Sequence, residues 1–180
     1  MRRQPPGSGR ALTNRMSWAV ILFASGESPL AAQVAARDRY VTRAKAWLRD
    51  SRPLAGYATR LRARANVEVF DAHPAEVDRI VERPDVLRTG ISASELVGLT
   101  GGRGAAEVYA PAGRRDEIIG RHALDPGAGP VRLRWIDDDL WPLVQQAGDH
   151  GQAPTVAVLL DLLESDDPRA RREAAKALGS

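Results

Sequence analysis

The sequence predicts an α/β protein, with α+β as the alternative: a layered domain with a mixed sheet of about four strands, preceded by a small basic helical module. Strand-like and helix-like segments alternate from residue 66 onward. Positive charge is concentrated before them, because residues 1–65 carry 13 basic and 3 acidic side chains, whereas residues 66–180 carry 13 and 20. We therefore expect a disordered basic tail (1–16), a helical module (17–65) and an α/β body (66–180).

The first 24 residues combine a basic tail with an apolar segment. Residues 1–14 are rich in proline, glycine and arginine, a composition typical of disorder. The apolar segment 17–24 follows four arginines, as in a signal peptide, but it is short and no small-x-small cleavage site follows at once. No stretch approaches the roughly 18–20 apolar residues that cross a bilayer. We expect a core segment of a cytoplasmic protein without a membrane partner.

Residues 28–50 allow two interpretations. Ser28-Pro29 is a helix start, and Leu30, Val34, Val41 and Leu48 form one apolar stripe, which favours a single helix. The alternative is a helix-turn-helix, with helices at 29–36 and 42–50 and a turn near 38–41. Arg39 lies where such a turn usually has glycine, which counts against this alternative. If the segment binds DNA, the side chains expected to contact phosphates are Arg37, Arg39, Arg43, Lys45 and Arg49.

A basic helix is predicted at 57–65, after the breaks at Pro53 and Gly56. Its arginines at 60, 62 and 64 favour a solvated helix face, with a phosphate track as the alternative. The basic module as a whole could bind nucleic acid or dock on the acidic body, and both possibilities stay open.

The body is predicted to contain strands at 67–70, 86–87, 106–110 and 131–136, and helices at 75–82, 115–121, from 155, and from 168 to 178. The strand at 131–136 alternates cleanly, with Val131, Leu133 and Trp135 on one face and Arg132 and Arg134 on the other. This pattern predicts a half-buried strand at or near a sheet edge.

The segment 85–99 reads as a strand, a turn at Gly90 and a helix that opens at Ser92. In Ser92-Ala-Ser-Glu95, Ser92 would cap the helix and Glu95 would reach back to the cap, as in a capping box. Such a unit often lies at a ligand-binding edge, but no catalytic base, metal cluster or phosphate-binding lysine accompanies it. We expect structural roles for Gly90, Ser92 and Glu95.

Asp161 lies inside the apolar helix VAVLLDLL. A buried carboxylate needs a partner, and Arg169, beyond the turn at 165–168, is the expected one. The pair is predicted to stabilise the fold.

The sequence carries no recognisable catalytic or cofactor site. It has no cysteine, which excludes disulfides, thiol catalysis and cysteine–zinc sites. The glycine loop at 101–104 lacks the lysine of a P-loop, the three histidines lack zinc-site spacing, and no GxSxG motif is present. The run Asp137–Asp139 is expected to be a solvated turn. We expect no enzyme activity, no metal and no cofactor.

Four segments of the body form a recognisable series: LRTGISASELVGL (87–99), EVYAP (107–111), GPVRLRWIDDDLWP (129–142) and APTVAVLLDLLESDDPRARREAAKAL (153–178). In this order they resemble the C-terminal region of AbiEi-type antitoxins of type IV toxin–antitoxin systems and related bacterial transcriptional regulators. The resemblance implies a non-enzymatic protein whose N-terminal winged helix-turn-helix binds promoter DNA. It also implies that the C-terminal domain contacts a partner, such as a nucleotidyltransferase-like toxin or a second copy. The chain departs from the pattern in its short N-terminal region, the missing turn glycine and the lack of a wing hairpin.

The leading functional hypothesis is therefore an AbiEi-like antitoxin or transcriptional regulator that binds DNA through its N-terminal helices. The alternative is a protein- or ligand-binding α/β domain without DNA contact.

Overall fold

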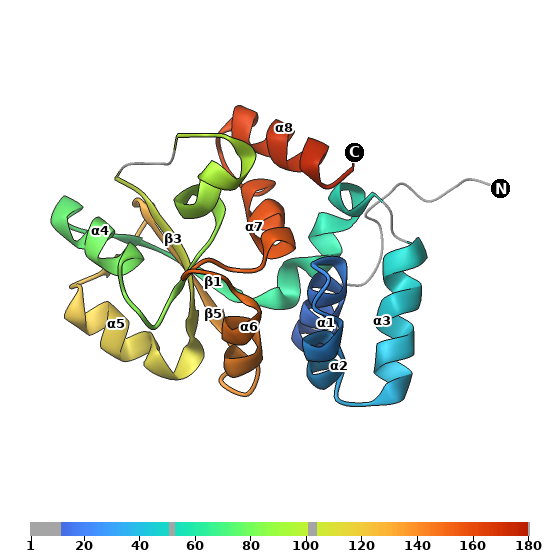
Figure 1. The fold of residues 1–180 in the computed structure, drawn as a ribbon. Coiled ribbons are helices and arrows are strands. Elements are labelled where there is room, and N and C mark those ends of the chain that lie inside the picture. The colour runs from blue at the N-terminus through green and yellow to red at the C-terminus, as the bar shows by residue number, and fades with distance from the viewer. Residues whose placement is uncertain (1–11, 51–52, 101–103, 180) are drawn as a thin grey trace.

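A five-stranded mixed sheet forms the centre of the computed structural model, which describes residues 12–50, 53–100 and 104–179 (Figure 1). The strand order is β2-β3-β5-β1-β4. β3 and β5 are parallel and the other neighbours are antiparallel. The strands are β1 (Asn66–Asp71), β2 (Leu87–Arg88), β3 (Ala106–Pro111), β4 (Asp125–Pro126) and β5 (Val131–Ile136). The predicted layered α/β domain is confirmed, and it contains one further strand, β4, at a place where the sequence predicted none.

The prediction that residues 131–136 form a half-buried strand at or near a sheet edge is wrong. β5 is the central strand, paired on one side with β3 and on the other with β1, so that Leu133 lies between Val108 and Glu68. Its alternating pattern reflects two buried faces of different chemistry. Arg134, which the pattern assigned to solvent, is 1% exposed.

One face of the sheet is apolar and is covered by α4 (Pro74–Val81) and α5 (Arg115–Arg121), which follows the short turn η3 (Ala112–Arg114). The side chains of this layer come from β1, β3, β5 and the two helices, and include Phe70, Val77, Ile80, Val108, Ile118, Leu133 and Trp135. His73 caps α4, because its Nδ1 accepts a hydrogen bond from the Ala75 N–H at 3.2 Å. Both helices match the predicted segments.

The other face of the sheet is covered by η2 (Gly90–Val97), α6 (Trp141–Ala147) and α7 (Thr155–Leu162), and α8 (Pro168–Ala177) packs on α7 and η2. Every residue of α7 from Val156 to Leu162 is buried, because the helix lies between the sheet and the N-terminal helices. Asp167 caps α8 and Pro168 opens it, as the sequence predicts.

The N-terminal module consists of α1 (Asn14–Ala24), α2 (Ser28–Ala35), α3 (Asp38–Asp50) and η1 (Leu54–Arg64). Trp18 to Leu22 of α1 are completely buried, which confirms the predicted core segment. α1 begins at Asn14, where Thr13 caps it, so the module starts slightly earlier than expected. The rest of the predicted tail, 1–11, lies outside the described residues. Within the described part of the chain, no helix is long and apolar enough to cross a membrane.

Candidate nucleic-acid interface

Residues 28–50 form two helices joined by a two-residue turn, and the expectation of a single helix is wrong. α2 ends at Ala35, and Ala36 adopts a left-handed conformation with φ +62°. The Ala36 N–H donates to the carbonyls of Ala32 and Gln33, both at 3.1 Å, and closes the end of α2. The apolar spacing was misleading because Leu30 and Val34 on α2, and Val41 and Leu48 on α3, pack on the same core from two separate helices.

The turn lies earlier than the helix-turn-helix alternative placed it. The residue in the left-handed conformation is Ala36, and Arg39, which the alternative placed in the turn, lies in the first turn of α3. The turn therefore has alanine in a conformation that glycine usually adopts. Between α3 and β1, residues 53–65 contain η1 and no wing hairpin.

α3 packs through Ala44 and presents a polar face to solvent on the outer side of the module (Figure 1). At about 100° per residue, Thr42 and Ala46 lie at the centre of the face opposite Ala44. Arg39 and Arg43 then follow one edge of this face, and Lys45 and Arg49 follow the other. All five cations proposed to contact phosphate, these four and Arg37 in the turn, are exposed.

Within the described residues, the side-chain hydrogen bonds, ion pairs and cation–π contacts of these cations involve only other residues of the N-terminal module. The Arg39 guanidinium donates to the Tyr40 hydroxyl at 3.0 Å, the Lys45 ammonium lies 5.1 Å from the centre of the Phe23 ring, and Arg49 lies 3.2 Å from its neighbour Asp50. None of these five cations pairs with a carboxylate among the described residues of the body. Their charge is therefore available to an anionic partner.

Other arginines of the module face the body. Arg15 pairs with Asp139, and Arg62 lies 3.8 Å from Glu164. Arg64 is 1% exposed and pairs with Asp161. Part of the basic charge of the module therefore docks on the acidic body, whereas the cations of α3 do not take part in this contact. The favoured interpretation of the arginines of η1 as a solvated face is therefore wrong for Arg64, which is buried.

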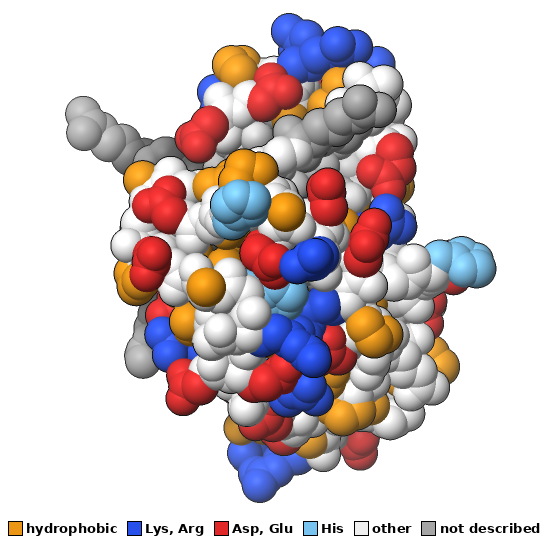
Figure 2. Space-filling view, turned by 90° about the vertical axis from the view of Figure 1, so that its left-hand side faces the viewer, with side chains coloured by type: hydrophobic (Ala, Val, Ile, Leu, Met, Phe, Trp, Pro, Cys, Tyr) orange, Lys and Arg blue, Asp and Glu red, His pale blue; other side chains and the backbone are white. Residues whose placement is uncertain are grey.

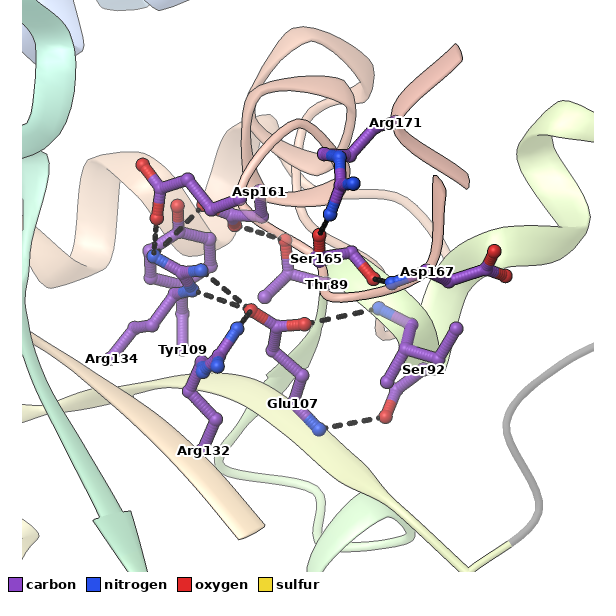
Figure 3. Close-up of polar contacts among 12 residues, drawn as sticks. Thr89, Ser92, Glu107, Tyr109, Arg132, Arg134, Asp161, Ser165, Asp167 and Arg171 are labelled. Carbon is purple, nitrogen blue, oxygen red and sulfur yellow. Dashed lines mark hydrogen bonds and ion pairs between the residues drawn. The ribbon is translucent and has the colours of Figure 1, made fainter. Parts of the chain in front are cut away.

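The buried contact between the module and the body centres on Asp161. Its carboxylate accepts hydrogen bonds from the Arg64 guanidinium and from the Thr89 hydroxyl, and it lies 3.1 Å from Arg134. Figure 3 shows Asp161, Arg134 and Thr89 converging from α7, β5 and the segment before η2. The prediction of Arg169 as the partner is wrong, because Arg169 is exposed and its backbone N–H donates to the cap Asp167 instead.

Arg64 and Arg134 share further partners. Arg64 donates to the Tyr109 hydroxyl at 3.0 Å and to Glu164 at 3.0 Å. Arg134 donates to Glu164 at 3.1 Å and to Glu107 at 2.5 Å. We call these residues, together with Asp161 and Thr89, the buried ion network.

The surroundings of Asp161 favour its ionised form. Burial works to raise the pKa of Asp161, but the guanidinium groups of Arg134 and Arg64 and the Thr89 hydroxyl outweigh it, so the pKa lies below its usual value. Burial and the adjacent Asp161 raise the pKa of the Tyr109 phenol, which keeps the hydroxyl protonated as a partner for Arg64. Each charged group of the network contacts a group of opposite charge, which suits a structural role.

The capping box predicted at 92–95 is wrong. The Ser92 hydroxyl accepts a hydrogen bond from the Glu107 backbone N–H at 2.8 Å, and Glu95 lies 3.4 Å from Arg88. η2 is capped at Thr89 without a side-chain bond. Gly90 is required, because its φ is +48° and an added Cβ would lie 1.9 Å from a carboxylate oxygen of Glu107. Ser92 and Gly90 therefore join η2 to β3.

The other polar groups singled out in the sequence have separate partners. Asp137 accepts from Asn14, Asp138 accepts from the Gly113 N–H, and Asp139 pairs with Arg15, so the aspartates do not converge. The described residues contain no group of three or more His, Asp or Glu side chains arranged for a metal ion. Residues 101–103 of the glycine loop lie outside the described residues.

The side of the molecule over α4 and α5 contrasts with the α3 face. Figure 2 shows basic and acidic side chains interspersed on that side. Several are paired there, including Arg83 with Asp85 and Arg114 with Glu117. His122 lies between the two helices, with its Nδ1 2.8 Å from Glu76. This mixed surface offers an anionic polymer no uniform positive field.

Sequence reasoning missed Arg64 and Arg134 as partners of Asp161. A usable signal was present, because a carboxylate inside an apolar helix and an arginine inside an apolar strand each require an opposite charge.

No family model, no curated protein and no solved structure matches this chain.

Proposed function

We propose that this chain is a non-enzymatic, AbiEi-like antitoxin or transcriptional regulator that binds DNA through α2 and α3. One observation carries the DNA-binding part. α3 follows a short turn after α2 and exposes Arg39 and Arg43 along one edge and Lys45 and Arg49 along the other. No carboxylate among the described residues of the body pairs with these four cations.

The dimensions of α3 suit the major groove of DNA. Its 13 residues give a length of about 20 Å. An α-helix with its side chains is about 10–12 Å in diameter, which fits a groove about 12 Å wide. Cations along both edges of the helix can reach the phosphates that border the groove. Thr42 and Ala46 then face the base edges, where a hydroxyl and methyl groups can contribute to sequence recognition.

The antitoxin part of the proposal is supported by the resemblance of the body segments. In that family the body would contact a partner, either a nucleotidyltransferase-like toxin or a second copy of the chain. Co-expression with a toxin gene from the same operon tests this part: rescue of growth supports it, and unrelieved toxicity contradicts it.

A second candidate is an α/β domain that binds a protein or ligand without contacting DNA. The pairing of Arg15, Arg62 and Arg64 with the body favours it, because part of the basic charge stabilises the fold.

DNA binding can be tested by fluorescence anisotropy with the DNA upstream of the gene, at about 50 and 200 mM salt. The double variant Arg39→Gln/Arg49→Gln removes one cation from each edge of α3. The matched control Arg169→Gln/Arg172→Gln removes two exposed charges from α8. In the α3 variant, the plot of log association constant against log salt concentration should be shallower by roughly 1.8, since each phosphate contact contributes about 0.9 to the steepness of its slope.

The control should bind like the unmodified protein. Absence of binding at low salt, or equal losses in both variants, would refute DNA binding through α3.

A further inference from the structure

A cavity of about 480 Å³ lies between α1, α3 and η1, on the Arg43 edge of the α3 face. Its volume is within the range of small-molecule sites, about 300–1,000 Å³. Leu12, Met16 and Ala35 form apolar parts of its wall and are buried. Arg15, Arg43 and Arg60 supply its positive charge. The cavity thus combines an apolar wall with three guanidinium groups.

Two of these guanidinium groups lack a counter-charge among the described residues. Arg15 is already used, because it pairs with Asp139 and donates to the Val34 carbonyl at 2.9 Å. Arg43 makes no ion pair or side-chain hydrogen bond with a described residue. Arg60 lies with its guanidinium 5.6 Å from the centre of the Trp47 ring, and its Nε is buried without a hydrogen-bond partner.

A buried nitrogen donor without a partner is costly, because it has lost its hydrogen bonds to water. Arg60 and Arg43 both line the cavity, so one anionic group there could pair with the Arg60 guanidinium and balance the charge of Arg43. The tail that precedes Leu12 cannot supply that group from its side chains, because residues 1–11 contain no aspartate or glutamate. A separate small anion would complement the charge of the cavity.

We infer that this cavity binds a small carboxylate with an apolar body, and that the bound ligand competes with DNA for Arg43. The carboxylate contacts Arg60 and Arg43, and the apolar body lies against Leu12 and Met16. The competition rests on the proposed function, because Arg43 also lies on the α3 face. A ligand that holds Arg43 in the cavity withdraws one phosphate contact and weakens DNA binding.

Isothermal titration calorimetry with three probes tests the ligand class. Benzoate carries both a carboxylate and an apolar ring, benzamide has the same shape without the charge, and inorganic phosphate has charge without an apolar body. Benzoate should bind at least tenfold more tightly than the other two. Equal binding of benzoate and benzamide would overturn the role of the arginines. Tighter binding of phosphate would overturn the carboxylate and indicate a pocket for a backbone phosphate.

Variants of η1 place the site. Arg60→Met keeps the apolar chain over Trp47 and should weaken benzoate binding at least tenfold. Arg60→Lys restores a cation and should recover part of the loss. Arg62→Met, two residues away and exposed, is the matched control and should bind normally. Circular dichroism confirms that each variant is folded. Equal benzoate affinity in all three variants would overturn the site.

The competition is measured separately, as the DNA affinity with and without saturating benzoate. Benzoate should weaken DNA binding several-fold, and DNA should weaken benzoate binding by the same factor, because coupling is reciprocal. If the protein binds benzoate but no DNA, the cavity stands and the proposed function fails. If it binds both without mutual effect, the competition is refuted.

Discussion

Replacement of Arg64 by methionine tests whether the buried ion network fastens the module to the body. Methionine keeps most of the side-chain length, so the main loss is the charge and its hydrogen bonds. Asp161 would stay buried with Arg134 at 3.1 Å and the Thr89 hydroxyl at 2.5 Å as its remaining partners. Glu164 and the Tyr109 hydroxyl would also each lose a contact of 3.0 Å.

Removal of one partner from a buried ion pair typically costs about 3–5 kcal/mol, because the other charge stays desolvated. Since Arg134 and Thr89 remain in contact with Asp161, we expect the lower end for Arg64→Met, about 3 kcal/mol. For a protein of this size, that corresponds to a fall in Tm of roughly 6–12 °C.

The matched control is Arg62→Met on the same helix. Arg62 is 66% exposed and lies 3.8 Å from Glu164, so its loss should cost at most about 0.5 kcal/mol. Urea unfolding, followed by tryptophan fluorescence and circular dichroism, measures both variants. If the free energy of unfolding of Arg64→Met lies within about 1 kcal/mol of that of the unmodified protein, the network does not hold the module on the body. Equal losses of stability in both variants would lead to the same conclusion.

Three further perturbations follow from other features. Ala36→Gly should raise the free energy of unfolding by about 0.5–1 kcal/mol, because glycine relieves the left-handed conformation at an exposed site; a lower Tm would contradict this. Gly90→Ala should cost at least about 2 kcal/mol, since the new Cβ meets Glu107 and the φ is positive; an unchanged urea midpoint would count against it. A hydrogen bond from Arg115 lowers the pKa of Glu68 in the folded state, so its stabilisation is present above about pH 4.3 and is lost as the pH falls. Thermal melts between pH 7 and 3 should show a smaller fall in Tm for Glu68→Gln, and an identical fall would refute the linkage.

The body elements were largely predictable from local sequence. Strands β1, β3 and β5 and helices α4, α5, α7 and α8 each have an apolar period or a cap that identifies them. β4 was missed because two residues in a glycine–proline loop carry no strand period, although they pair with Asp71 and Phe70. Periodicity reports which side chains are buried, and it does so well in these segments.

The long-range polar contacts were not predictable by the same reasoning. Asp161 was correctly predicted to need a partner, but nearness in sequence suggested Arg169, whereas the fold brings in Arg64 and Arg134 from other elements. The turn at Ala36 was obscured for a different reason. Its conformation depends on the packing of α2 and α3 on α1, and alanine has no local preference that would reveal it.

The central position of β5 has a consequence for how the protein folds during synthesis. β1 and β3 do not pair with each other, because each lies beside β5. Before residues 131–136 have left the ribosome, the sheet can exist only as separate pieces, β2 with β3 and β1 with β4. The edges of β1 and β3 that face β5 then remain unpaired until β5 is available. The arrival of this one strand joins the two halves of the sheet in a single step.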